Sequence, residues 1–238
     1  MANPLHLTLD VDWAPDAVID HVAELILAQG VKATWFVTHW SPAIERLAQH
    51  PAHFELGIHP NFLKGSSHGE SVADVVAFCR DMLPKARSVR AHSLCMNGEI
   101  MAAFCRSADI GVDSSLFMPG VETIEPFVFE TAAGRVVRVP VYWSDDYQLA
   151  ANQANFTLPQ PAATGVKVFM FHPIHVFLNS PDFSYYESRK GLIFSGAAEP
   201  EQLTTVRHPG EGVGSSFEAL LRLLKNNGGG GHMSDFCA

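Results

Sequence analysis

The sequence predicts an α/β fold built mainly of parallel strands. Apolar runs of strand length alternate with amphipathic segments of helical spacing through most of the chain. The chain has 238 residues, of which 47% are apolar, so it can bury a large core without disulfides or structural metals. Polar side chains also follow the ends of several predicted strands. We therefore expect residues 1–238 to form a single domain.

The first half of the chain shows this alternation most clearly. The helix expected at Asp16–Gln29 has apolar residues at helical spacing and ends at Gly30. The next expected helix begins at Pro42, where the missing N–H costs nothing. The strands expected here are Leu5–Val11, Lys32–Thr38, Phe54–His59, Ser88–Ala91 and Ile110–Ser114, and the other helices are Ser71–Met82 and Asn97–Ser107.

The second half is less regular. Two extended segments, Phe127–Thr131 and Arg135–Trp143, flank a glycine turn, and residues 144–164 are polar enough to predict a loop. Val166–Phe171 is the most apolar predicted strand. Residues 179–212 show no clear period, and we expect a last helix at Ser216–Leu224.

Composition excludes several function classes. A net charge of −9 argues against nucleic-acid binding, which needs a basic surface. No segment approaches the roughly 18 apolar residues of a membrane span. The first ten residues lack a secretory leader, and the four cysteines lack Cys-x-x-Cys spacing, so we expect a reduced cytoplasmic setting. Glycine-rich nucleotide-binding motifs are also missing.

The most informative pattern is the position of polar residues. The carboxyl ends of parallel strands open onto one face of a sheet or barrel, where active sites form. Polar residues stand at or just after such predicted ends at Asp10, Asp12, His59, Asn61, Arg90, His92, Asp113, His172 and His175. We predict that these side chains share one site.

Asp10 and Asp12 would point to the same side of an extended strand, because side chains alternate with a period of two. Two carboxylates so close repel each other unless a cation or a proton separates them. A metal on one would leave the other as a base. The alternative is a strand-end turn in which an aspartate caps the backbone.

Histidines offer further ligands. His59 ends a strand, and His68 lies in a Gly/Ser-rich loop that could fold back over the site. One carboxylate and two histidines form the shell of a catalytic zinc site with an open position. The alternatives are a packed histidine at position 59 and a loop or cap histidine at position 68.

The remaining candidates suit acid–base chemistry and substrate contacts. His172 follows the most apolar strand and could protonate a leaving amine, and His175 is close behind it. Arg90 could hold a carboxylate, whereas His92 fits a ligand, a substrate contact or a packed ring equally well. Trp143 offers an aromatic wall, and Asp145 or Asp146 could orient a catalytic imidazole.

The order of these motifs resembles the polysaccharide deacetylases of the NodB-homology class. The matching segments are Leu-Thr-Leu-Asp-Val-Asp (7–12), Leu-Gly-Ile-His-Pro-Asn-Phe (56–62), Val-Arg-Ala-His-Ser-Leu (89–94), Gly-Val-Asp-Ser-Ser-Leu (111–116) and Phe-His-Pro-Ile-His (171–175). Residues 172–179, followed by Tyr186-Glu187, resemble the WbmS-like branch of surface-polysaccharide gene clusters. The resemblance implies a distorted (β/α) barrel and a divalent metal, with zinc expected, that helps hydrolyse the N-acetyl group of an amino sugar.

The resemblance also implies roles for individual residues. Asp10 corresponds to the base and His172 to the general acid. Asp12 and His59 correspond to metal ligands, and Arg90 to the arginine that fixes the catalytic carboxylate. Asp146, or its neighbour Asp145, would orient His172.

One departure concerns the metal shell. The family's second metal histidine falls at Leu63 here, so we expect His68 as its substitute, with Asn61 next and His92 third. Asn61, His92, Trp143 and His175 are otherwise expected to contact the glycan substrate. Two alternatives stay open, which are another metal-dependent amide hydrolase of this fold, allantoinase-like, and a degenerate barrel that binds glycan without cleaving it.

Overall fold

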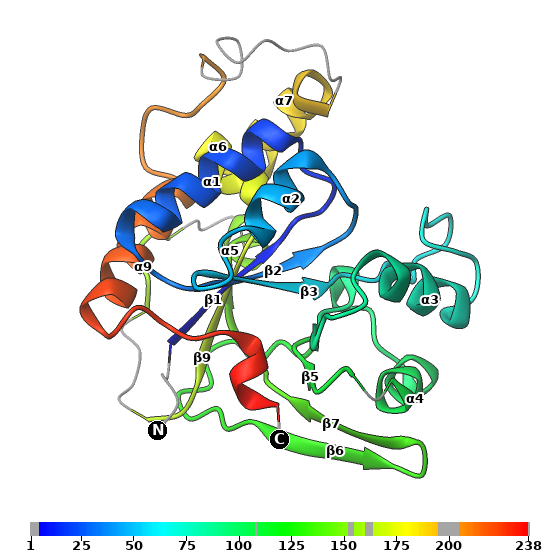
Figure 1. Cartoon of the computed structure of the whole chain (residues 1–238). Coiled ribbons are helices and arrows are strands. Elements are labelled where there is room, and N and C mark those ends of the chain that lie inside the picture. Colours follow the sequence, from blue (N-terminus) through cyan, green and yellow to red (C-terminus); the bar gives the residue numbers. More distant parts are fainter. Residues whose placement is uncertain (1–4, 108, 152–154, 160–163, 195–204, 238) are drawn as a thin grey trace.

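The computed structural model describes residues 5–107, 109–151, 155–159, 164–194 and 205–237. Within these residues nine strands form one sheet, in the order β6-β7-β5-β4-β3-β2-β1-β9-β8 (Figure 1). The strands are β1 (Leu5–Asp10), β2 (Ala33–Val37), β3 (Phe54–Ile58), β4 (Ser88–Val89), β5 (Val112–Asp113), β6 (Phe127–Thr131), β7 (Gly134–Arg138), β8 (Val141–Ser144) and β9 (Lys167–Phe171). All neighbouring pairs are parallel except the β6–β7 hairpin. The predicted parallel α/β fold is confirmed.

The sheet curls toward its own far edge. After β5 the chain runs beside β8, where Phe117 forms a parallel bridge with Val141. Two backbone hydrogen bonds hold this contact, from Val141 N to Leu116 O and from Met118 N to Val141 O. The bridge connects the chain that leaves β5 to the edge strand β8, as a distorted barrel requires.

Helices cover the outer face of the sheet. They are α1 (Asp16–Gln29), α2 (Pro42–Ala48), α3 (Val72–Met82), α4 (Gly98–Arg106), α5 (Asp145–Ala150), α6 (Pro173–Leu178), α7 (Phe183–Phe194) and α9 (Val213–Asn226), with short 3-10 turns η1 (His92–Leu94) and η2 (Met233–Phe236). Figure 1 shows α1 and α6 packed side by side over the central strands. In the described residues, no helix is long and apolar enough to cross a membrane.

The central strands β1, β2 and β9 are buried along their whole length, on both faces of the sheet. On β2, Trp35 packs in the large core beneath the helices, whereas Phe36 points into a smaller cluster on the opposite, inner face. Strand β9 alternates in the same way, with Phe171 outward and Met170 inward. Polar side chains on the inner face, such as Thr8 and Asp10, therefore lie inside the curled sheet.

The structure differs from the expected elements in the second half. Residues 145–150 form α5 inside the predicted loop, and the segment predicted as irregular contains the whole of α7. Helix α5 has one turn and a half, too short to show a period, and in α7 only Ile193 is buried, so no apolar stripe marks it. The predicted strand Arg135–Trp143 is broken at Val139–Pro140, since proline donates no ladder hydrogen bond.

Candidate active site

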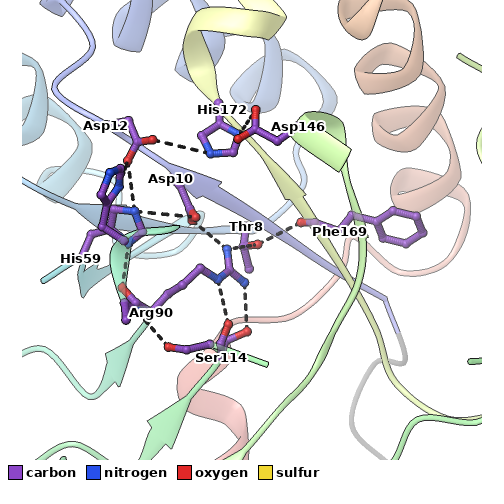
Figure 2. Close-up of polar contacts among 12 residues, drawn as sticks. Thr8, Asp10, Asp12, His59, Arg90, Ser114, Asp146, Phe169 and His172 are labelled. Carbon is purple, nitrogen blue, oxygen red and sulfur yellow. Dashed lines mark hydrogen bonds and ion pairs between the residues drawn. The ribbon is translucent and has the colours of Figure 1, made fainter. Parts of the chain in front are cut away.

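Residues from the carboxyl ends of five strands meet at one end of the curled sheet (Figure 2). Strand β1 brings Asp10 and Asp12, and β3 brings His59. Strand β4 contributes Arg90 and His92, β8 leads into Asp145 and Asp146, and β9 leads into His172. The structure thus brings together most of the residues that the sequence placed in one site.

Arg90 is fully buried behind Asp10. Its Nη1 donates to Asp10 Oδ1 at 2.7 Å and to Thr8 Oγ1 at 2.8 Å, while Nε and Nη2 donate to the carbonyl and hydroxyl of Ser114. Its guanidinium lies 4.4 Å from the centroid of the Phe36 ring. A buried carboxylate needs such a partner, and the fixed guanidinium holds Asp10 in one orientation.

Asp12, His59 and His92 converge beside this pair. Asp12 Oδ1 lies 3.1 Å from His59 Nε2 and 2.9 Å from His92 Nδ1. One ligand atom from each residue lies within 4.8 Å of the other two. Although burial opposes its ionisation, contacts with His59 and His92 hold the pKa of the Asp12 carboxyl well below its usual range.

The donor chemistry of this cluster fits a metal ion. His59 Nδ1 must be the hydrogen-bond donor to the Arg90 carbonyl at 2.7 Å, so neutral His59 presents a lone pair at Nε2. That lone pair faces a carboxylate oxygen, and two such acceptors repel unless a proton or a cation separates them. A carbonyl behind a ligating histidine is the usual outer partner in metal sites. Two imidazoles and one carboxylate suit zinc.

Asp12 reaches the cluster through an unusual backbone. Strand β1 ends at Asp10, and Asp12 and Trp13 have φ of 45° and 57°, in the left-handed region. Our expectation that Asp12 follows the alternation of an extended strand is therefore wrong. Such residues cost about 1–2 kcal/mol each, and Ser93 and Leu94, which follow His92, share the same region. Backbone strain of this kind gathers at functional sites.

His172 faces the cluster from the other side. Its Nδ1 donates to Asp145 Oδ1 at 2.8 Å, its backbone N–H donates to Asp145 Oδ2 at 2.7 Å, and its Nε2 lies 3.7 Å from Asp12 Oδ2. Burial disfavours the imidazolium, but the carboxylates of Asp146 and Asp145 outweigh it and raise the pKa of His172 well above its usual value. His172 is suited to hold a proton.

The two neighbouring aspartates divide their contacts. We expected Asp146 to orient His172, but the shorter contact belongs to Asp145, and Asp146 Oδ1 lies 3.4 Å from His172 Nδ1. Asp146 Oδ1 also lies 3.2 Å from His175 Nε2. Asp145 is the first residue of α5, and its carboxylate is directed into the protein and fully buried. The Asp146 carboxylate is half-exposed.

His68 is not in the metal cluster. Its Nδ1 accepts a hydrogen bond from Asn61 N at 3.1 Å, and its Nε2 donates to the Thr38 carbonyl at 2.8 Å. Both ring nitrogens are therefore used, and burial lowers the pKa of His68, which disfavours its charged form.

Among the residues expected as a third ligand, the structure places His92 rather than His68 beside Asp12 and His59. His92 stands two residues after Arg90, just beyond the end of β4. This position just after a predicted strand was the sequence signal that could have identified His92.

The other expected substrate contacts lie differently. His175 is buried, and its Nδ1 contacts the hydroxyl of Ser180 at 3.1 Å, so it supports Asp146 from behind. Trp143 is also buried and packs on Phe171 with ring centroids 4.8 Å apart. Asn61 is partly exposed, and its side-chain oxygen accepts from Leu63 N.

Comparisons with known proteins find a matching family and similar structures. The model of the WbmS-like polysaccharide deacetylase family matches residues 7–190. A solved structure from Bordetella bronchiseptica, WbmS, is 32% identical with a TM-score of 0.81, and the match covers 93% of this chain and 90% of that one. WbmS is provisionally described as a polysaccharide deacetylase involved in O-antigen biosynthesis.

A second solved structure shares only the fold. It is the Bc1960 peptidoglycan N-acetylglucosamine deacetylase, with 10% identity and a TM-score of 0.50 over 99% of this chain and 88% of that chain. No curated protein matches the sequence.

Proposed function

The chain belongs to the WbmS-like polysaccharide deacetylase family, and on this premise we propose that it removes the N-acetyl group of an amino sugar, using a zinc ion held by Asp12, His59 and His92. Family membership makes the protein a deacetylase, a hydrolase of amide C–N bonds. The sugar, the metal and the residue roles are the parts that we add. The Bordetella relative supports a place in O-antigen biosynthesis for this chain as well.

One observation carries the proposal. A carboxylate and two imidazoles place one ligand atom each within 4.8 Å of the others on one side, and a proton-holding imidazole, His172, stands 3.7 Å from that carboxylate on the other. Amide hydrolysis needs both features, because the carbonyl must be made electrophilic and the amine must leave with a proton. A barrel that only bound glycan would need neither.

Leu63 stands where the family's second metal histidine is expected, but the proposed metal shell does not depend on that position. That side chain is 44% exposed, and His92 from β4 supplies the second imidazole. The departure from the family pattern thus moves one ligand from one strand end to the next.

When bound, a zinc ion would polarise the acetyl carbonyl and lower the pKa of a water molecule. Asp10 accepts the proton of the attacking water, since Arg90 keeps its carboxylate in place while Oδ2 faces the cluster. Attack on the carbonyl carbon and cleavage of the C–N bond yield acetate and an amine.

His172 donates the proton that the leaving nitrogen takes up. The carboxylates of Asp146 and Asp145 raise its pKa and so favour its charged form, and Asp145 fixes the ring so that Nε2 points to the cluster. After the step, Asp10 loses its proton to solvent and His172 takes up a proton from solvent, so both groups return to their starting states.

Acetate release from N-acetylated amino sugars by the zinc-loaded protein tests the proposal. We expect activity in the wild type and none in Asp10→Asn or His172→Ala, with circular dichroism spectra unchanged. Ammonia release from small amides, assayed in parallel, separates the allantoinase-like alternative. Wild-type activity in either variant would remove that residue from the mechanism, and acetate release from no amino sugar would refute the substrate class.

A further inference from the structure

The two histidines of the proposed metal shell differ in how their rings are held. The second ring nitrogen of His59 is fixed by the Arg90 carbonyl, 2.7 Å away. For Nε2 of His92, by contrast, no hydrogen-bond partner is found among the residues that the structure describes. A metal-binding histidine ordinarily has such an outer partner, which fixes the direction of its ring. The orientation of His92 therefore needs another cause.

The main chain anchors His92 but leaves its ring free to rotate. The backbone N–H of His92 donates to the Pro60 carbonyl at 2.9 Å, and this bond does not restrict the side-chain torsions. His92 begins η1, a 3-10 turn of three residues, in which Ser93 has a left-handed φ of 54°. The side chain is 18% exposed, so burial alone does not fix it. Its direction depends on the groups that pack against the ring.

Two aromatic rings meet the His92 imidazole edge-on. The centroid of the His59 ring lies 5.4 Å away with an angle of 90° between the ring planes, and the centroid of the Trp13 ring lies 5.4 Å away at 80°. Aromatic pairs favour this edge-to-face arrangement. Because His59 is itself a proposed ligand, Trp13 is the ring contact that comes from outside the metal shell.

Trp13 is held in place without the help of a metal. Its backbone N–H donates to Thr38 Oγ1 at 3.0 Å, and its φ of 57° continues the left-handed turn that begins at Asp12. Its ring also contacts His68, with centroids 5.5 Å apart, and His68 in turn stacks on Phe78. Strained backbone persists where the surrounding structure over-determines it. The turn that carries one ligand thus also places an indole ring against another.

We infer that Trp13 is a positioning residue of the metal site, whose ring holds His92 in the orientation in which Nδ1 faces Asp12 at 2.9 Å. The inference rests on the metal site of the proposed function and deepens it, because Trp13 acts through a ligand. It also accounts for a ligand on a short turn, in place of the histidine that the family pattern puts at Leu63.

The test measures the zinc affinity of the full chain by competition with fluorescent chelators of graded affinity, so it needs neither substrate nor turnover. Trp13→Ala should weaken zinc binding about tenfold, as the loss of an outer partner of a ligand does. Alanine keeps the Cβ atom, so the left-handed backbone at position 13 costs the same in the variant. Trp13→Phe keeps an aromatic ring and should recover most of the affinity.

A second background distinguishes positioning from a general loss of structure. In His92→Ala the ring that Trp13 holds is gone, so adding Trp13→Ala should weaken zinc binding no further. Trp40→Ala removes an exposed tryptophan that follows β2, and as the control it should leave zinc affinity unchanged. Circular dichroism spectra of all variants should stay native.

The outcomes separate this inference from the proposed function. If Trp13→Ala binds zinc as the wild type does while His92→Ala binds it more weakly, Trp13 does not position the ligand and the proposed metal shell stands. If Trp13→Ala weakens zinc binding by the same factor in both backgrounds, its effect is structural and the inference fails. If His92→Ala keeps the wild-type affinity, the proposed shell itself fails. Acetate release, measured separately, tests the reaction.

Discussion

The site consists of two halves that contain the same residue types and differ in how they are partnered. The cation half is Asp12, His59 and His92, and the proton half is His172, Asp145, Asp146 and His175. They face each other across the 3.7 Å between Asp12 Oδ2 and His172 Nε2.

In the proton half, nitrogens that carry hydrogens surround the carboxylates. The Asp145 carboxylate accepts from the backbone N–H groups of His172 and Asp146 and from the ring of His172. In the cation half, the His59 nitrogen that faces Asp12 has no hydrogen when the ring is neutral, because the other nitrogen donates to the Arg90 carbonyl.

Residue type therefore does not decide which group of histidines and carboxylates holds a metal. Asp145, Asp146 and His172 also lie close enough together for one ion, but both oxygens of Asp145 already accept hydrogen bonds from N–H groups. The partner of the second ring nitrogen separates the halves, since a carbonyl frees a lone pair at His59 and a carboxylate stabilises a proton at His172.

Removing the cation should have the largest effect, because only one half depends on it. Dialysis against a strong chelator should reduce acetate release to the uncatalysed rate while the far-ultraviolet spectrum stays native. Adding zinc should restore the activity. Full activity in protein shown by elemental analysis to be free of metal would contradict the assignment of the cation half.

The next effect tests the proton half. Asp145→Asn removes the charge that stabilises imidazolium at His172, and kcat should fall roughly 10²–10⁴-fold, the range of general acid catalysis. Asp146→Asn should cost less, because its contact with His172 is 3.4 Å rather than 2.8 Å. Zinc content should stay at the wild-type level in both, and a loss of zinc in Asp145→Asn would show that the halves are not separate.

A third prediction compares two histidines directly. His92→Ala removes a ligand and should weaken zinc binding by at least about 100-fold, more than the loss of an outer partner does. His68→Ala should leave zinc affinity unchanged, because neither of its ring nitrogens is free. Competition with a fluorescent zinc chelator measures the zinc affinity of both variants. Weaker zinc binding in His68→Ala than in His92→Ala would restore His68 as the ligand.

The sequence was sufficient to predict the site residues whose positions are set by strands. Asp10, His59, Arg90 and His172 stand at strand ends, and parallel strands bring their ends to one face. The five strands of residues 5–113 were predictable because they are short apolar or alternating runs, and most of their residues are buried.

Where loops and short helices determine positions, the sequence was not sufficient. The path from Asn61 to His68 depends on hydrogen bonds to Thr38 and Asn61 that no period encodes. Asp145 and Asp146 are adjacent, and only the first turn of α5 decides which of them turns inward.

The smallest effect concerns His68, the histidine outside both halves. Its buried ring donates to Thr38 O and accepts from Asn61 N, so it must stay neutral, and its pKa in the folded protein is lowered from 6.5. The unfolded chain then binds more protons, and the stability contributed by neutral His68 is complete above about pH 6.5 and is lost as pH falls below it. His68→Ala should cost about 1–3 kcal/mol at pH 8, because it leaves two buried backbone groups unpaired.

That difference between wild type and His68→Ala should shrink as pH is lowered from 8 to 5, since only the wild type keeps a histidine that resists protonation. Urea unfolding of chelated protein measures it without the pH dependence of metal binding. Val75→Ala, an apolar truncation in α3, is the matched control, and its cost should be the same at both pH values. A His68→Ala difference that grows toward acid pH would mean that the ring is charged in the folded protein and that its contacts resemble those of the proton half.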